Sequence, residues 1–223
     1  MRYGILQFPG SCDERDAMAA ATRVGDAELI WHQRDSLGDV DAIIVPGGFS
    51  YGDYLRCGAI AQFAPAMRAV ARFAADGGPV LGICNGFQVL CEAGLLPGAL
   101  LTNSGLRFLC RQAEIVVASN ACSWTAGCAT GERLSIPVKH TTGRYFAPPE
   151  LLERIEAAGQ VTLRYAADQN PNGSLNEIAG ICNRAGNVMG LMPHPEHAVD
   201  PLTGSVDGLR LIGAIGQPAA AGA

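Results

Sequence analysis

Cys84 is the residue whose setting points most directly to chemistry, because it stands between two glycines in the stretch VLGICNGFQVL. Gly82 and Gly86 fit the spacing glycine-x-nucleophile-x-glycine, in which the chain bends sharply from a strand into a helix and holds the nucleophile up. A helix N-terminus carries partial positive charge that favours the thiolate needed for attack, and the Asn85 N–H can stabilise an oxyanion. The pattern predicts a nucleophilic thiol, while a small core cysteine in a glycine-rich turn is the alternative.

A nucleophilic thiol needs a base, and His194 in MPHPEH follows the apolar run VMGLM. The flanking prolines favour extended backbone, so His194 and Glu196, two residues apart, can project to the same side. A carboxylate beside an imidazole fixes its tautomer and stabilises the imidazolium. We therefore expect a triad of Cys84, His194 and Glu196, although PHPE alone also fits a rigid surface turn. His32 is expected to be structural, and neither His140 nor His197 receives a role.

A glycine-rich loop, PGGFSYGDYLRCG at residues 46–58, is the second candidate feature. It lacks G-x-G-x-x-G, which argues against a dinucleotide site, and the sole lysine, Lys139, does not follow a glycine, so no P-loop is present. Gly47 and Gly48 allow a substrate to approach the backbone closely, and an N–H in this loop would complete an oxyanion hole. A tight turn without a ligand is the alternative.

Strands that alternate with helices must position these residues. Strands are expected at 3–8, 27–32, 41–45, 79–83, 106–111, 113–119, 133–139 and 161–166, with a hairpin around 184–186. Helices are expected from Ser11 or Asp13 to about Val24, from near Pro65 to Gly77, after Cys84, and over 206–215. The order predicts an α/β fold: a mostly parallel central sheet with helices on both faces plus an antiparallel extension. Ligands bind such sheets beyond the carboxyl ends of the strands, where Cys84, His194 and the glycine-rich loop all fall.

Composition excludes several classes of protein. The 223 residues are 48% hydrophobic, which suits one domain over residues 1–223, and the Ala/Gly tail after about Gln217 is expected to be disordered. A net charge of −5 and a single lysine leave no basic stripe for nucleic acid. The sequence shows neither a signal peptide nor an apolar run of about 18 residues, so no membrane association is expected. Eight cysteines without a C-x-x-C pair indicate free thiols in a cytoplasmic protein and argue against a metal site.

Four stretches together resemble one family: PGGFSYGDYLRCGAIA, GICNGFQVLCEAGLLPGALL, PNGSLNEIAGICN and GNVMGLMPHPE. G-x-C-x-G-x-Q with a later H-P-E is similar to class I, triad-type glutamine amidotransferases, whose fold is flavodoxin-like. The longer strings, from about residue 3 to 212, resemble the amidotransferase subunits of phosphoribosylformylglycinamidine synthase. The resemblance implies hydrolysis of the L-glutamine side-chain amide by Cys84, His194 and Glu196, with Gln88 holding glutamine and Gly48 and Asn85 supplying oxyanion-hole N–H groups.

The same resemblance implies partners. Ammonia would pass to a synthetase subunit that converts formylglycinamide ribonucleotide to formylglycinamidine ribonucleotide in purine biosynthesis, and a small accessory subunit would join the complex. ATP and magnesium are expected on the synthetase, with no cofactor in this chain, which agrees with the missing P-loop.

Some residues depart from the family's pattern. Thr141 and Thr142 stand where H-G-E-G-R-Y is usual, His197 replaces the arginine of H-P-E-R, and GSCDERD is one residue shorter than usual. These differences bear on local glutamine binding or docking rather than on the reaction. A stand-alone thiol hydrolase and a non-catalytic binding module of the same fold are the alternative interpretations.

Overall fold

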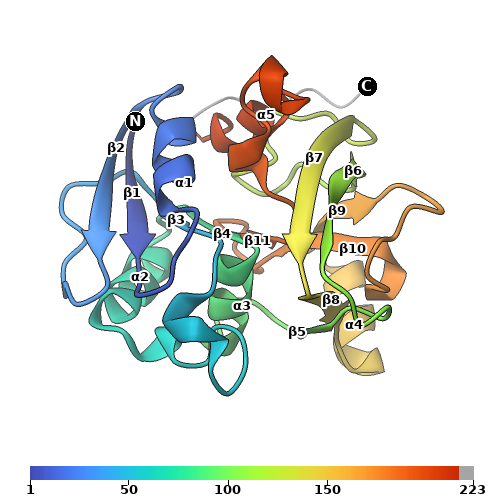
Figure 1. The fold of residues 1–223 in the computed structure, drawn as a ribbon, viewed down its shortest axis with the longest axis horizontal. Helices are drawn as coiled ribbons and strands as arrows, with labels where there is room; N and C mark the ends of the chain where they lie inside the picture. Colours follow the sequence, from blue (N-terminus) through green and yellow to red (C-terminus); the bar gives the residue numbers. More distant parts are fainter. Residues whose placement is uncertain (216–223) are drawn as a thin grey trace.

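A nine-stranded mixed sheet organises residues 1–215, the part of the chain that the computed structural model describes (Figure 1). Its strand order is β2-β1-β3-β4-β11-β10-β9-β6-β7. The first five strands are parallel: β2 (Asp26–Trp31), β1 (Arg2–Gln7), β3 (Ala42–Val45), β4 (Val80–Ile83) and β11 (Val188–Leu191). Strands β3, β4 and β11 are buried along their whole length, as expected for parallel strands covered on both faces. The predicted α/β class is confirmed.

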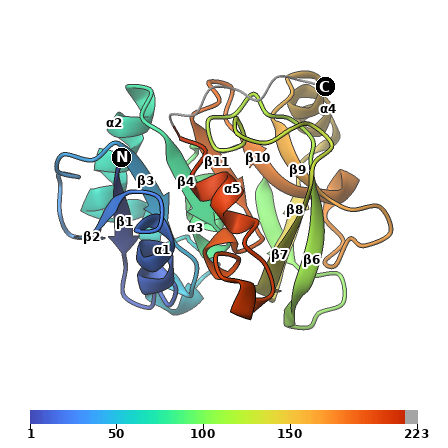
Figure 2. The same ribbon diagram turned by 90° about the horizontal axis from the view of Figure 1, so that it is seen from above.

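Helices cover both faces of the parallel strands (Figures 1 and 2). Helix α1 (Glu14–Ala21) packs on β1 and β2 and contacts α5 (Gly208–Ile212), whereas α3 (Asn85–Glu92) packs on β3, β4 and β11 from the opposite side. The crossovers through α1 and through α2 (Pro65–Ala75) run in opposite directions along the sheet, which places these two helices on opposite faces. Helices α1 and α5 are shorter than the sequence pattern predicts.

The antiparallel extension follows β11 through β10 (Ile178–Cys182), β9 (Val161–Tyr165), β6 (Leu109–Val117) and β7 (Arg133–His140). Two expected strands, 106–111 and 113–119, prove to be the single strand β6, because residues 109–116 pair with β7 without interruption. Leu106 adopts a positive φ of 53° and lies in the preceding loop. A two-stranded sheet of β5 (Ala99–Thr102) and β8 (Thr142–Phe146), and helix α4 (Pro149–Ala157), were not predicted. The predicted hairpin between β10 and β11 is present. The expected disordered tail lies outside the described residues.

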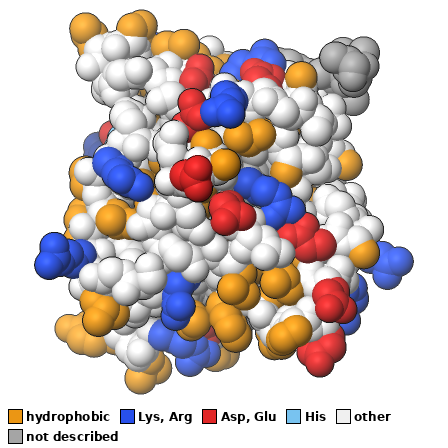
Figure 3. Space-filling view, turned by 90° about the vertical axis from the view of Figure 1, so that its right-hand side faces the viewer, with side chains coloured by type: hydrophobic (Ala, Val, Ile, Leu, Met, Phe, Trp, Pro, Cys, Tyr) orange, Lys and Arg blue, Asp and Glu red, His pale blue; other side chains and the backbone are white. Residues whose placement is uncertain are grey.

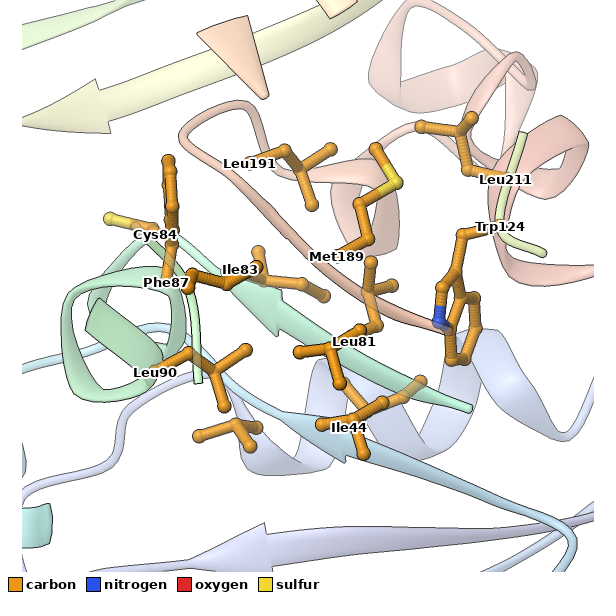
Figure 4. Close-up of a cluster of buried hydrophobic side chains, with 14 of the residues drawn as sticks. Ile44, Leu81, Ile83, Cys84, Phe87, Leu90, Trp124, Met189, Leu191 and Leu211 are labelled. Carbon is orange, nitrogen blue, oxygen red and sulfur yellow. The ribbon is translucent and has the colours of Figure 1, made fainter. Parts of the chain in front are cut away.

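The register of strands β4 and β11 brings the segments that carry Cys84 and His194 together. Strands β4 and β11 are direct neighbours, with Ile83 paired to Leu191, so both chains leave the sheet at the same point of the same edge. Apolar side chains below this edge form the core; Figure 4 shows Cys84 at the margin of this cluster, with its sulfur directed away from the other labelled side chains. The core therefore fixes the backbone of the elbow and leaves its thiol at the rim.

The surface shows no large region of one charge on the face formed by the antiparallel end, where acidic and basic side chains are interspersed (Figure 3). Within residues 1–215, no helix combines the length and the apolar character that crossing a bilayer requires.

Candidate active site

Cys84 occupies the turn between β4 and α3 in an unusual backbone conformation, with φ 50° and ψ −103°. Two backbone hydrogen bonds hold it there: the Cys84 N–H donates to Leu191 O at 2.8 Å, and the Gln88 N–H donates to Cys84 O at 3.2 Å. The turn also requires Gly86, because a Cβ at that position would collide with the carbonyl group of Val45. The elbow predicted from the glycine spacing is thus a consequence of helix α3 packing directly against β3.

His194 and Glu196 lie together beyond the end of β11. The Nδ1–H of His194 donates to Glu196 Oε1 at 2.6 Å, and both residues are buried, at 1% and 3% exposure. The His194 N–H also donates to Pro137 O of β7 at 2.8 Å, which fixes this segment to the antiparallel extension. Nε2 of His194 has no hydrogen-bond partner among the described residues, and both His194 and Cys84 line the same pocket. The structure therefore brings the three predicted triad residues to one place.

The electrostatics of His194 suit a group that holds a proton. Burial alone would lower the pKa of its imidazole, but the Glu196 carboxylate and the Cys84 thiol group raise that pKa to about 10. Because Nδ1 is held by Glu196, Nε2 is the nitrogen left to exchange a proton with a substrate or with Cys84. The arrangement provides a nucleophile, a proton carrier and a carboxylate that orients the carrier.

Asn85 and Gln88 fasten the glycine-rich loop to helix α3. The Asn85 side chain accepts a hydrogen bond from the Ser50 N–H and donates to Asp53 Oδ1 at 3.1 Å and to Gln88 Oε1 at 2.9 Å. The Gln88 Nε2 then donates to Thr142 O at 2.5 Å. Gln88 lines the pocket, but part of its hydrogen-bonding capacity is committed to the pocket wall. The Asn85 N–H, at the first position of α3, has no acceptor within the helix.

Gly47 and Gly48 occupy different places in the site. A Cβ at Gly47 would lie 2.5 Å from Asp13 Oδ2 and 2.8 Å from His194 Cε1, so this glycine lets the loop pack behind the imidazole. Gly48 has a φ of 128°, forms an isolated bridge with Ser11, and lines the pocket beside Cys84. Of the two, Gly48 is the one whose backbone reaches the pocket.

The pocket that contains Cys84 and His194 includes side chains that the sequence analysis did not assign to it. Asp13 was predicted only as one of two starting residues of the first helix. Its side chain makes no cap hydrogen bond, and its Oδ1 instead accepts from Lys139 Nζ at 2.6 Å. Lys139 also lines the pocket, and its carbonyl oxygen accepts from Cys84 Sγ at 3.8 Å. No local signal identifies this pair, because its members are 126 residues apart.

The remaining histidines have distinct surroundings. His32 Nδ1 hydrogen-bonds the Tyr51 hydroxyl at 2.6 Å, consistent with a structural role. His140 lines the pocket, and burial together with the His194 charge lowers the pKa of its imidazole to about 4, so it is neutral at pH 7. His197, one of the departures from the family pattern, places Nε2 3.4 Å from Asp13 Oδ1 and 3.6 Å from Glu196 Oε1. Thr141 and Thr142, the other departures, both line the pocket.

Comparison with known proteins agrees with this geometry. The family described as the CobB/CobQ-like glutamine amidotransferase domain matches residues 1–208. Among curated relatives, the phosphoribosylformylglycinamidine synthase subunit PurQ of Rubrobacter xylanophilus is 57% identical over 95% of this chain and 96% of its own length. PurQ of Nostoc sp. is 53% identical, over 95% of both chains.

Solved structures give the same assignment. A chain in the structure of PurLQS from Thermotoga maritima superposes with a TM-score of 0.88 at 41% identity, covering 96% of both chains. A glutamine amidotransferase from Thermotoga maritima, with a TM-score of 0.56 and 15% identity over 88% of this chain and 76% of its own, shares the fold alone. This chain belongs to the CobB/CobQ-like glutamine amidotransferase family, and the curated relatives named above within that family are PurQ subunits of phosphoribosylformylglycinamidine synthase.

Proposed function

We propose that this chain is the glutaminase subunit of phosphoribosylformylglycinamidine synthase: it hydrolyses the side-chain amide of L-glutamine and delivers the ammonia to a synthetase subunit. The observation that carries the proposal is the buried pair of His194 and Glu196, with Nδ1 2.6 Å from Oε1, in the same pocket as the Cys84 elbow. Relatives with more than half of their residues identical carry the name of this subunit.

The first half-reaction follows from the arrangement of the triad. The Cys84 sulfur, whose proton is held on His194 Nε2, adds to the amide carbon of glutamine, and the carbonyl π electrons move onto oxygen. The N–H groups of Gly48 and Asn85 are the proposed donors to that oxyanion, each contributing about 3 kcal/mol of transition-state stabilisation. His194 then donates its Nε2 proton to the leaving nitrogen, the C–N bond breaks, and ammonia and a glutamyl thioester remain.

The second half-reaction reverses the proton flow. Neutral His194 accepts a proton from water at Nε2, the hydroxide oxygen bonds to the thioester carbon, and the C–S bond breaks to give glutamate and the Cys84 thiolate. Glu196 keeps Nδ1 protonated throughout, which leaves Nε2 as the exchanging nitrogen. Gln88, tied to Thr142 O, shapes the wall that holds the glutamine chain and uses its remaining hydrogen-bonding capacity on substrate.

The proposal extends to partners and location. ATP and magnesium bind the synthetase subunit, a small accessory subunit completes the assembly, and this chain needs no cofactor of its own. The PurLQS structure supports an assembly of this kind, since the neighbour in it is 41% identical to this chain. A cytoplasmic location is supported by the eight cysteines, all of which are free thiols.

One experiment tests the function. Glutamate release from glutamine is measured for the chain alone and with the synthetase and accessory subunits, together with the Cys84→Ser variant and Cys110→Ser, which alters an exposed thiol on β6, as matched control. The proposal expects release that rises with the partners, is lost by at least about 1,000-fold in Cys84→Ser, and is unchanged in Cys110→Ser.

Two outcomes would contradict the proposal. Turnover of simple esters or peptides with indifference to glutamine would identify a stand-alone thiol hydrolase. Unchanged activity of the complex that contains Cys84→Ser would identify a binding module. Labelling by a glutamine-mimicking alkylator gives a second readout: Cys84 should react first, since burial raises the pKa of the neighbouring Cys57 thiol to about 12.

A further inference from the structure

Asp13 is a second carboxylate beside the catalytic imidazole. Its Oδ2 lies 3.6 Å from His194 Nδ1, the nitrogen that already donates to Glu196. Asp13 is 3% exposed, and Gly47 leaves the space in which the Asp13 carboxylate and the His194 ring approach each other. A helix cap does not explain this placement, because the Asp13 side chain makes no cap hydrogen bond to α1.

A buried carboxylate requires a partner, and Lys139 supplies the positive charge. Its Nζ lies 2.6 Å from Asp13 Oδ1, so one oxygen of the carboxylate contacts the ammonium while the other, Oδ2, faces the imidazole of His194. Burial would raise the pKa of the Asp13 carboxyl, but His197, Lys139 and His194 hold it well below its usual range. Burial would lower the pKa of the Lys139 ammonium, but Asp13 raises it. Both groups are therefore charged at neutral pH.

The ion pair also joins the two halves of the sheet. Asp13 precedes α1 in the parallel half, whereas Lys139 lies on β7, the outermost strand of the antiparallel extension. The carbonyl oxygen of Lys139 accepts from Cys84 Sγ, so one residue contacts the nucleophile through its backbone and the second carboxylate through its side chain.

The charges around His194 can be enumerated from the elements packed against it: Cys84 from the elbow, Asp13 from the start of α1, Lys139 and His140 from β7, and Glu196 and His197 from the following turn. Four of these side chains each offer one potential ligand atom, and these atoms lie within 4.8 Å of one another, a spacing that also suits a cation: Asp13, His194, Glu196 and His197. The Lys139 ammonium already occupies one oxygen of this cluster.

The geometry points to Asp13 and Lys139 as a positioning pair that sets the proton affinity of His194: Asp13 strengthens the imidazolium, and Lys139 limits that effect so that the proton can be released to the leaving amine. This inference rests on the proposed function, because it assigns the pair a part in glutamine hydrolysis. Two carboxylates without the lysine would hold the proton too tightly for a general acid.

The test is the pH profile of glutamate release by the assembled complex between pH 6 and 11.5, a range that includes the basic limb set by His194 and its upward shift. Asp13→Asn should move the basic limb down by about 1 pH unit, and Lys139→Met should move it up by about 1 pH unit. In the double variant the basic limb should return to within a few tenths of a pH unit of its position in the unmodified protein, because both the negative and the positive charge of the ion pair are then absent. Equal losses of rate at every pH, with unmoved limbs, would overturn the inference and leave the pair purely structural.

A second measurement avoids substitutions that fail to fold. Lys139 is the sole lysine of the sequence, so amine reagents modify only this side chain and the N-terminus. Acetylation removes the charge and should shift the basic limb upward, whereas reductive dimethylation keeps the charge and should not; identical profiles after both treatments would refute the pair's electrostatic role. Lys139→Met treated in parallel controls for the N-terminus.

Failure of the proposed function is distinguishable from failure of this inference. Unmodified protein that releases no glutamate at any pH refutes the function. The pair is then tested by the rate of Cys84 alkylation with iodoacetamide across the same pH range, for which the two variants should again shift the profile in opposite directions.

Discussion

Glu196 Oε1 lies 2.6 Å from Nδ1 of His194, and the other nitrogen of that ring is free of protein partners among residues 1–215. Only Pro195 separates the two residues in the chain, and the turn that it begins brings both side chains to one side. The carboxylate thus selects which nitrogen handles the proton, and it does so inside the core, where water cannot compete.

Glu196→Gln should lower glutamine-dependent turnover by about 100- to 10,000-fold, because the amide neither fixes the tautomer nor stabilises the imidazolium. The Glu196 charge raises the pKa of His194, so the basic limb of the pH profile should also move to lower pH. Glutamate release by the complex measures both effects, and synthesis supported by added ammonia serves as the control. An unmoved basic limb would contradict the assigned role.

Gly47→Ala should reduce glutamate release by about 10- to 100-fold, because the new Cβ would displace the Asp13 carboxylate or the His194 ring. The matched control is Gly105→Ala, since a Cβ at Gly105 meets no atom within 4 Å. Steady-state kinetics of both variants, with circular dichroism to verify folding, decide the matter. Equal activity of the two variants would show that the imidazole is not confined by this loop.

Asn85→Ala should destabilise the protein by about 1–3 kcal/mol, since the buried Ser50 N–H loses its acceptor and Asp53 loses a donor. The glycine-rich loop should then loosen, and KM for glutamine should rise. Urea unfolding and kinetics measure the two effects. Gln112→Ala, on an exposed side chain, should change stability by less than about 0.5 kcal/mol. A stable Asn85→Ala variant with unchanged KM would refute the anchoring role.

His140 should make the protein sensitive to mild acid. Burial and the His194 charge lower the pKa of its imidazole from 6.5 to about 4, so the unfolded chain binds a proton that the folded protein does not. Its contribution to stability is present above pH 6.5 and is lost as the pH falls through about 4. Between pH 7 and pH 5, the free energy of unfolding should fall by about 2 kcal/mol less in His140→Gln than in the unmodified protein. Equal losses in urea titrations at the two pH values would disprove this.

The sequence predicted the helices and strands whose apolar residues form a regular pattern. It also predicted the site residues that lie together in one short segment of the chain. The runs around β1, β3 and β4 are short and apolar, and the elbow at Cys84 is marked by its own glycines, so local pattern suffices there. Strand β6 was predicted as two strands because the consecutive residues Cys110, Arg111 and Gln112 are exposed, which interrupts the apolar pattern on both faces, and because the apolar residues Leu106 and Phe108 belong to a loop.

The rest of the site depends on distance in space. Asp13 follows Cys12 in a segment that has the pattern of a helix start, and Lys139 lies in an alternating strand; neither has a local mark of chemistry. Only the tertiary fold, which brings the loop after β1 to the edge strand β7, places them together. Gln88 illustrates a different limit, since the family resemblance implied substrate binding while its amide is partly engaged by Thr142 O.

The backbone of Cys84, at φ 50° and ψ −103°, has one consequence for the whole molecule. A residue with a side chain is disfavoured there by about 1–3 kcal/mol, and glycine would relieve this strain. Replacing the thiol by glycine should therefore yield a protein that resists denaturation better than the natural one and no longer turns over glutamine. The strained backbone of Cys84 would then lower the stability of the folded protein at the residue that we propose as its nucleophile.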